Sequence, residues 1–200
     1  MSGSKKQNMF CELKDLRNEA TVEALFVDRL LKALDYPDNR VRRKESLTEF
    51  TIGRGSKKES YKPDYVLLNS AGEPIVVLDA KNPNEDPGKY HYQVSGYALQ
   101  LNQKYPDKNP VRYTLLTNGY QLIVYPWDNE TPIFFLRFED FEVDNEKWLE
   151  LRSNLSYTAF KQIALIKDVF SFERPELSTL IKTLHDCHNL IRKKDSLSPT

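Results

Sequence analysis

The 200-residue sequence has few cysteines, no long apolar run and no net charge. No apolar stretch approaches the ~20 residues of a membrane-spanning helix, so we expect no membrane partner. The N-terminal residues lack the apolar core of a secretory signal peptide. The two cysteines, Cys11 and Cys187, are far apart and form no CxxC pair. Together these absences predict a cytoplasmic protein with reduced thiols.

Positive charge is concentrated locally, although 29 basic residues balance 29 acidic ones over the whole sequence. The balance means that composition alone does not indicate a nucleic-acid-binding protein. One basic run lies at 40–44 and another at 54–58, and each could contact phosphate or form a solvated loop. The stretch 53–58 contains glycine and lysine but lacks P-loop spacing, so it does not predict nucleotide hydrolysis.

The apolar pattern predicts one domain over 1–150 and a helical extension or linker over 151–200. Apolar residues at helical spacing predict helices over about 15–34 and 89–103, and a helical pattern returns after about 145. The predicted strands are 46–53, 64–69, 74–81, 111–117, 120–126 and 133–138. The order of helix, three strands, helix and further strands predicts an α/β (α+β) layer fold with a mixed sheet.

Two charged residues, Asp79 and Lys81, end an otherwise aliphatic strand. Strand side chains alternate between faces, so both point to the same side of the sheet. The preceding turn, 70–73, joins this strand to the one before it as a hairpin. A turn centred on 71–72 predicts three cross-strand pairs: Leu68 with Ile75, Val66 with Val77, and Asp64 with Asp79.

Facing carboxylates destabilise a sheet unless a cation lies between them. Lys81 is one candidate for that cation, and a divalent metal ion such as Mg²⁺, which prefers carboxylate oxygens, is the other. The prediction depends on the register, because a slip of one residue would put Asp64 and Asp79 on opposite faces.

Pro63-Asp64 followed by Asp79-Ala80-Lys81 resembles the signature of the PD-(D/E)XK nucleases. The stretch 93–97 resembles the Q-x-x-x-Y motif of one branch of that superfamily. This branch includes the N-terminal endonuclease domain of type I restriction enzyme R subunits and of fused, type I-like or type IIG, restriction–modification proteins. The stretch 115–125 resembles a strand–turn–strand of the same branch, and 18–37 resembles its N-terminal helix.

The resemblance implies a restriction-endonuclease-like core that hydrolyses phosphodiester bonds with Mg²⁺, for which Mn²⁺ substitutes. The implied metal ligands are Asp64, Asp79, the carbonyl of Ala80 and Glu19, with Glu23 as an alternative to Glu19. Lys81 would hold or deprotonate the attacking water. Gln93 would hydrogen-bond Lys81 or a DNA phosphate, and Tyr97 would support the site. The second acid is aspartate, where glutamate is commoner in the family.

The resemblance also implies double-stranded DNA as substrate, with dimerisation on DNA for double-strand cleavage. A methyltransferase or specificity domain or subunit would supply sequence recognition. The stretch 182–200 resembles the start of the helical region before an adenine-N6 methyltransferase domain, so we expect the chain to be part of a longer protein. Two alternatives stay open: a catalytically silent nuclease-fold module of a modification enzyme that binds DNA or positions a methyltransferase, and an unrelated α+β interaction domain.

Overall fold

The computed structural model describes residues 8–44, 62–105 and 108–163. The expected strand at 46–53, the basic run at 54–58 and most of the expected helical extension lie outside these residues. The chain divides into two compact units, 1–169 and 170–200, and all described residues belong to the first. In that described part, no helix has the length and apolar character needed to cross a membrane.

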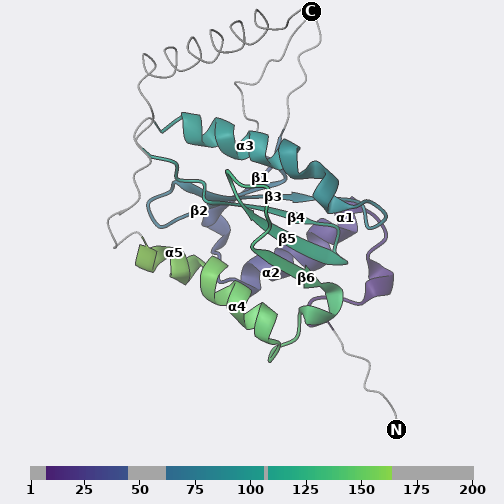
Figure 1. Ribbon diagram of the computed structural model, residues 1–200. Helices are drawn as coiled ribbons and strands as arrows, with labels where there is room; N and C mark the ends of the chain where they lie inside the picture. Colours follow the sequence, from purple (N-terminus) through teal and green to yellow (C-terminus); the bar gives the residue numbers. More distant parts are fainter. Residues whose placement is uncertain (1–7, 45–61, 106–107, 164–200) are drawn as a thin grey trace, which may run out of the picture. The chain divides into compact units, whose positions relative to one another are not determined.

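Six described strands form one mixed sheet in the order β1-β2-β3-β4-β5-β6 (Figure 1). Their bounds are β1 Val41–Arg43, β2 Tyr65–Leu68, β3 Pro74–Ala80, β4 Tyr113–Thr117, β5 Gln121–Pro126 and β6 Phe134–Arg137. All neighbouring strands are antiparallel except β3 and β4, which are parallel because a crossover helix joins them. The predicted α/β fold with a mixed sheet is therefore confirmed.

Helices cover both faces of the sheet, with α3 on one face and α1, α2, α4 and α5 on the other (Figure 1). The helices are α1 Glu19–Thr21, α2 Asp28–Ala33, α3 His91–Gln103, α4 Glu146–Leu155 and α5 Tyr157–Ile163. A π-helical turn, η2 (Val22–Val27), joins α1 to α2. The 3₁₀ turns are η1 Leu13–Asp15, η3 Asp38–Arg40, η4 Pro87–Tyr90 and η5 Phe138–Asp140.

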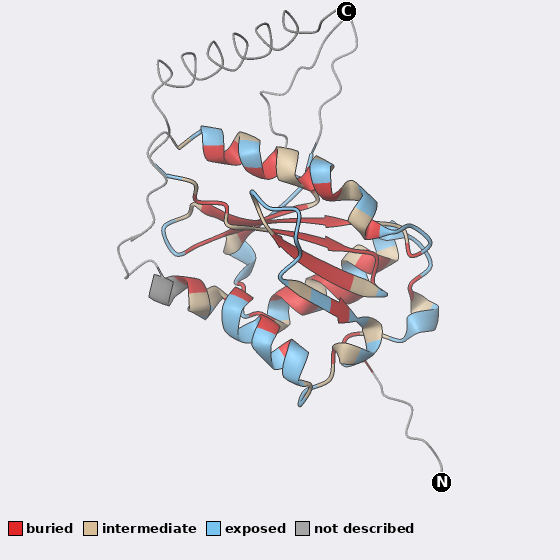
Figure 2. Cartoon of the chain, viewed as in Figure 1, coloured by how far each residue is buried: buried red, intermediate tan, exposed pale blue. Residues whose placement is uncertain are grey.

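Alternation along the strands creates two apolar clusters, one on each face. Val66 and Val77 pack with α3, whereas Leu67 and Leu78 belong to the cluster with the other helices. Strands β2 to β5 are buried along most of their length, and the helices expose their outer faces (Figure 2). The central strands are covered on both sides, so a charged side chain can reach solvent only near a strand end.

The first long helix begins at Glu19, four residues later than the sequence pattern predicts. Asn18 caps it: its Oδ1 accepts from the Thr21 backbone N–H at 2.9 Å, and Thr21 Oγ1 accepts from the Asn18 N–H at 3.0 Å. Such a reciprocal capping box satisfies donors that the helix itself cannot pair. The residues before it form the separate turn η1.

The β2–β3 hairpin has the predicted register on the side toward Asp64. Val66 pairs with Val77 as predicted, but Leu68 pairs with Pro74 rather than with Ile75. The pairing shifts between Leu67 and Leu68, at a bulge beside the turn. Gly72 adopts a φ of 81° in this turn, which is typical of a three-residue hairpin loop with a bulge. The shift is local and does not reach the strand ends that carry the acids.

The predicted β4–β5 hairpin turns at Asn118-Gly119, and Gly119 has a φ of 82°. A Cβ atom at Gly119 would lie 2.6 Å from Leu16 Cδ1, so any larger residue would clash as well as strain the backbone. The turn thus packs closely against the segment that leads into α1.

The helix α4 spans residue 150, where the sequence pattern suggests a domain boundary. Its buried residues Trp148, Leu151 and Leu155 belong to the same apolar cluster as the first helix. The break that ends α4 is at Ser156, which lies three residues after the predicted break at about 153. The assignment of 1–150 and 151–200 to separate functional domains stays a prediction.

Candidate active site

The predicted acids and lysine gather at the end of the β2–β3 hairpin that is farthest from its turn. Asp64 immediately precedes β2, Asp79 is the penultimate residue of β3, and Lys81 follows that strand. The antiparallel register pairs Tyr65 with Leu78, and its continuation sets Asp64 opposite Asp79. The site therefore depends on the hairpin register, as the sequence predicts.

Asp64 is half-buried and close to the second acid. Its Oδ2 accepts a hydrogen bond from the backbone N–H of Ala80 at 2.8 Å, which fixes the carboxylate across the hairpin. Burial, and then the negative charge of Asp79, raise the pKa of Asp64 to about 6. A carboxyl group in this state exchanges protons or binds a cation readily near neutral pH.

Asp79 is almost fully buried and forms an ion pair with Lys81. The distance from Asp79 Oδ2 to Lys81 Nζ is 2.5 Å, and the two side chains are 4% and 12% exposed. Burial opposes the charge on Lys81, but the hydrogen bond and charge of Asp79 outweigh it, so the pKa of Lys81 is raised. Lys81 is therefore a fixed cation held between carboxylates.

Two glutamates from the first helix complete the acidic group. One carboxylate oxygen from each of Glu19, Glu23 and Asp64 lies within 4.8 Å of the other two. Burial, then the charge of Asp64, raise the pKa of Glu19. The sequence leaves open whether Glu19 or Glu23 faces the site, and the structure brings both to Asp64. Oxygen-only donors at this spacing fit a hard divalent cation such as Mg²⁺.

Lys44 also contacts this acidic group, which the sequence does not predict. Its Nζ lies 3.1 Å from Glu23 Oε1, and its backbone N–H donates to the carbonyl of Asp64 at 2.8 Å. Lys44 has a φ of 48°, an uncommon backbone conformation for a residue other than glycine. The last residue of the 40–44 basic run therefore borders the acidic group, although its side chain is 61% exposed.

The two residues of the Q-x-x-x-Y stretch contact each other one helical turn apart. Gln93 Nε2 donates to the hydroxyl of Tyr97 at 2.7 Å. Tyr97 is 3% exposed and belongs to the apolar cluster under α3, and burial raises its pKa. This contact fits the predicted supporting role of Tyr97. The predicted bond from Gln93 to Lys81 or to a phosphate stays a prediction.

Tyr90 contacts Lys81 and was missed by the sequence analysis as a site residue. Lys81 Nζ lies 4.3 Å from the centre of the Tyr90 ring, which is the geometry of a cation–π interaction. Burial, and then a hydrogen bond to Glu85, raise the pKa of Tyr90. Helical spacing predicts Tyr90 only as an apolar-face residue of the helix expected over 89–103, whereas it ends the turn η4 just before α3.

The turn between β3 and α3 is held by a distant side chain. Asn118 is 4% exposed, and its Nδ2 donates to the carbonyl oxygens of Pro83 and Glu85 at 3.3 and 2.8 Å. The β4–β5 turn therefore fixes the path of the chain from Lys81 to Tyr90. A hairpin signal alone predicts only the turn and not this contact.

No family model and no curated protein matches the chain. Similar solved structures include a fragment assigned to the HsdR subunit of a type I restriction enzyme from Vibrio vulnificus YJ016, with 20% identity and a TM-score of 0.46 over 68% of this chain. A DrdV–DNA complex has 16% identity and a TM-score of 0.40 over 70%. The type IIG restriction endonuclease BpuSI has 16% identity and a TM-score of 0.44 over 78%.

The present chain spans 25% of the HsdR fragment, 82% of the DrdV chain and 19% of BpuSI.

Proposed function

We propose that this chain is a metal-dependent endonuclease domain that hydrolyses phosphodiester bonds of double-stranded DNA within a restriction–modification system. The observation that carries the proposal is the buried Asp79–Lys81 pair, whose acid faces Asp64 at a strand end. Facing carboxylates at a buried strand end are costly for folding, and such groups are concentrated at functional sites. The PD-(D/E)XK-like and Q-x-x-x-Y-like sequence motifs support the choice of DNA as substrate.

Lys81 supplies the cation nearest to the reacting phosphate in this proposal. Its Nζ is fixed by Asp79 and by the ring of Tyr90, so it needs little reorganisation when charge develops on the phosphate. An attacking water next to Lys81 would be oriented by its N–H groups, and a neighbouring carboxylate would accept the proton.

The acidic group is the proposed metal site. Glu19, Glu23 and Asp64 would hold a divalent cation, with Asp79 and the Ala80 carbonyl as the further ligands implied by the motif. The bound cation would stabilise negative charge on the phosphate and lower the pKa of a bound water. Lys44 Nζ, which now lies against Glu23, would have to move away from the carboxylate or share it.

The decisive experiment is nicking of supercoiled plasmid DNA by the 200-residue chain with Mg²⁺ or Mn²⁺. The variants Asp79→Asn and Lys81→Met should each reduce the nicking rate by roughly 10²-fold or more, the effect expected of a positioned acid–base group. The matched controls are Asp140→Asn and Lys147→Met, because these residues form an aspartate–lysine pair on the surface. Circular dichroism before each assay would confirm that every variant is folded.

Metal binding gives a second measurement that does not depend on activity. Mn²⁺ should raise the melting temperature of the parent, because a ligand that binds only the folded state stabilises it. The increase should be smaller in Glu19→Gln and Glu23→Gln and unchanged in Glu150→Gln, an exposed carboxylate on α4. Nicking that persists equally in Asp79→Asn, Lys81→Met and the parent would exclude this site as its source.

A silent DNA-binding module is the second candidate function. The observation that favours it is charge compensation within the chain: Lys81 already pairs with Asp79, and Lys44 already pairs with Glu23. This candidate predicts salt-dependent DNA binding that survives Lys81→Met, with no Mn²⁺-dependent stabilisation and no nicking. The melting and binding measurements therefore separate the two candidates even if the isolated chain does not cut DNA.

A further inference from the structure

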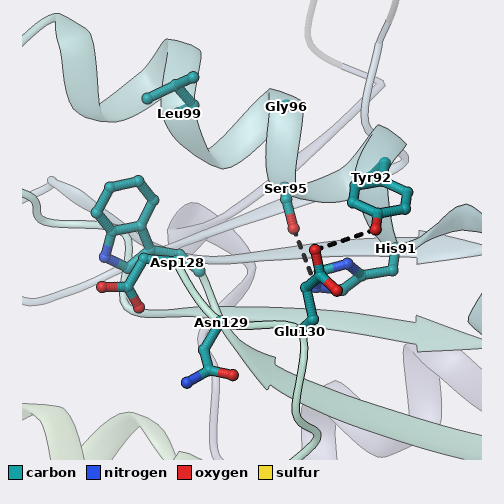
Figure 3. A pocket seen from close by; sticks show the side chains of 9 residues that line it. His91, Tyr92, Ser95, Gly96, Leu99, Asp128, Asn129 and Glu130 are labelled. Carbon is teal, nitrogen blue, oxygen red and sulfur yellow. Dashed lines mark hydrogen bonds between the residues drawn. The ribbon is translucent and has the colours of Figure 1, made fainter. Parts of the chain in front are cut away.

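A surface hollow lies between α3 and the loop after β5, and the proposed nuclease chemistry does not use it. Its volume is about 360 Å³. Tyr92, Gly96 and Leu99 line it from α3, and Trp127, Asp128 and Glu130 line it from the loop (Figure 3). The hollow therefore combines aromatic rings, an apolar side chain and two carboxylates.

Two carboxylates, Asp128 and Glu130, line this hollow beside the polar side chains of His91, Ser95 and Asn129. Glu130 Oε1 accepts a hydrogen bond from the hydroxyl of Tyr92 at 3.0 Å, which holds a carboxylate beside an aromatic ring (Figure 3). Asp128 and Glu130 are both exposed. No lysine or arginine is among the nine lining residues, all of which belong to the described part of the chain. A cation is the ligand that both the carboxylates and the ring faces attract.

The same surface exposes apolar area that a soluble protein normally covers. Tyr92 is 74% exposed and Leu99 is 47% exposed, on the same side of α3. A Cβ atom added at Gly96 would have no heavy atom within 4 Å, so a partner can approach the helix closely there. Exposed aromatic and aliphatic side chains beside polar groups are typical of protein–protein contacts.

DNA does not match this chemistry, because its phosphates would face Asp128 and Glu130. A basic protein segment does match it: a guanidinium or ammonium group meets the carboxylates and the rings, while its alkyl stem contacts Leu99. We propose that the hollow is a docking site for a basic, arginine-bearing segment of a protein partner. This surface is independent of the acidic group at the strand ends and of nuclease activity.

The test is a titration of the ¹⁵N-labelled chain with N-acetyl-arginine amide, followed by the two tryptophan indole N–H signals. Trp127 lines the hollow, whereas Trp148 is buried in the core and serves as the internal control. N-acetyl-citrulline amide is the matched probe, because it has nearly the same shape without the charge.

The arginine probe should shift the Trp127 signal saturably in the millimolar range, and the citrulline probe should not. Glu130→Gln should weaken binding roughly two- to fivefold, as expected for an exposed ion pair. Tyr92→Leu should also weaken it, and Glu150→Gln should have no effect. Added salt should weaken the binding of arginine in the parent.

Three results would overturn the proposal. An equal response to both probes, or none to arginine, would show that the hollow does not select a cation. A response unchanged in both Glu130→Gln and Tyr92→Leu would place the binding elsewhere. A saturable shift of Trp127 with a short DNA duplex, stronger than with the arginine probe, would identify a nucleic-acid surface instead.

Discussion

Two aspartate–lysine pairs lie in different surroundings within the described part of the protein. Asp140 in η5 and Lys147 on α4 are 3.1 Å apart; the lysine side chain is 58% exposed and the aspartate side chain 13% exposed. Asp79 and Lys81 are 2.5 Å apart at a strand end, and the lysine side chain is 12% exposed. Both pairs are held by the attraction between opposite charges, but different groups surround each pair.

The carboxylate of Asp140 accepts hydrogen bonds that stabilise its negative charge. Asp79 instead lies opposite a second carboxylate, that of Asp64. Slight burial raises the pKa of Asp140, but hydrogen bonds from the Arg137 N–H and Lys147 outweigh it and lower that pKa overall. At the strand end, burial and Asp79 instead raise the pKa of Asp64. A structural ion pair neutralises the charges of its two side chains. The strand end instead keeps an additional carboxylate, that of Asp64, beside a buried ion pair. Such unfavourable charge is concentrated at functional sites.

The largest expected effect is a difference in how much each ion pair contributes to the free energy of unfolding. Lys81→Met should lower the free energy of unfolding by about 3 kcal/mol at pH 8, because it leaves Asp79 buried without a counter-charge. Lys147→Met should lower it by less than about 1 kcal/mol, as for other exposed pairs. Urea denaturation measures both values.

The double variant Asp79→Asn/Lys81→Met should recover most of the loss, because it removes both charges together. Similar losses for Lys81→Met and Lys147→Met would mean that the two pairs are equivalent in energy.

The second effect concerns the aromatic ring that only the buried lysine has. Among the described residues, Tyr90 covers Lys81 and no ring covers Lys147. If Lys81 acts in nicking as proposed, Tyr90→Leu should slow it about tenfold, which corresponds to about 1.4 kcal/mol and is within the range for a desolvated cation–π contact. Tyr90→Phe keeps the ring and should retain most of the rate.

Single-turnover plasmid nicking, at saturating DNA, measures the Tyr90 effect on the chemical step. A loss in Tyr90→Phe as large as that in Tyr90→Leu would assign the role to the hydroxyl and its contact with Glu85.

The smallest effect distinguishes the two acids by the sign of their pH dependence. Because the pKa of folded Asp64 is raised, the folded state binds more protons than the unfolded state between about pH 3.8 and 6, so stability falls as pH rises through that window. Asp64→Asn should therefore be more stable than the parent at pH 8, by under about 1 kcal/mol, since Asp64 is only half-buried and solvent screens its charge.

Asp140→Asn should show the opposite sign: less stable than the parent at neutral pH, with the difference lost in acid, because the pKa of folded Asp140 is lowered. Thermal unfolding from about pH 4 to 8 measures both variants. A parent and Asp64→Asn with parallel pH curves would contradict the raised pKa of Asp64.

Local sequence periodicity predicts the part of the site that lies on one hairpin. The two-residue repeat sets Asp79 and Lys81 on one face, and the turn sets the register that faces Asp64. The register error at Leu68 arises because one inserted residue at the bulge leaves no clear mark in a hydrophobic pattern.

Contacts between distant segments are not predictable in the same way. The approach of Tyr90 to Lys81 depends on Asn118, whose side chain holds the intervening turn from another hairpin. The convergence of Glu19 and Glu23 on Asp64 depends on how the first helix packs across the sheet edge. Local propensity contains no information on either distance.

The π turn η2 has a consequence for how this protein could tolerate change. In a regular α-helix, residues five apart lie about 140° apart around the axis. In a π turn the backbone groups of such residues are hydrogen-bonded to each other. Here the Asp28 N–H donates to the Glu23 carbonyl. Glu23 can thus form an ion pair with Lys44 while Asp28 forms one with the preceding residue, Arg43. Deleting one residue here, Ala24 for example, would leave a shorter, regular helix whose two halves can no longer both reach their strand partners.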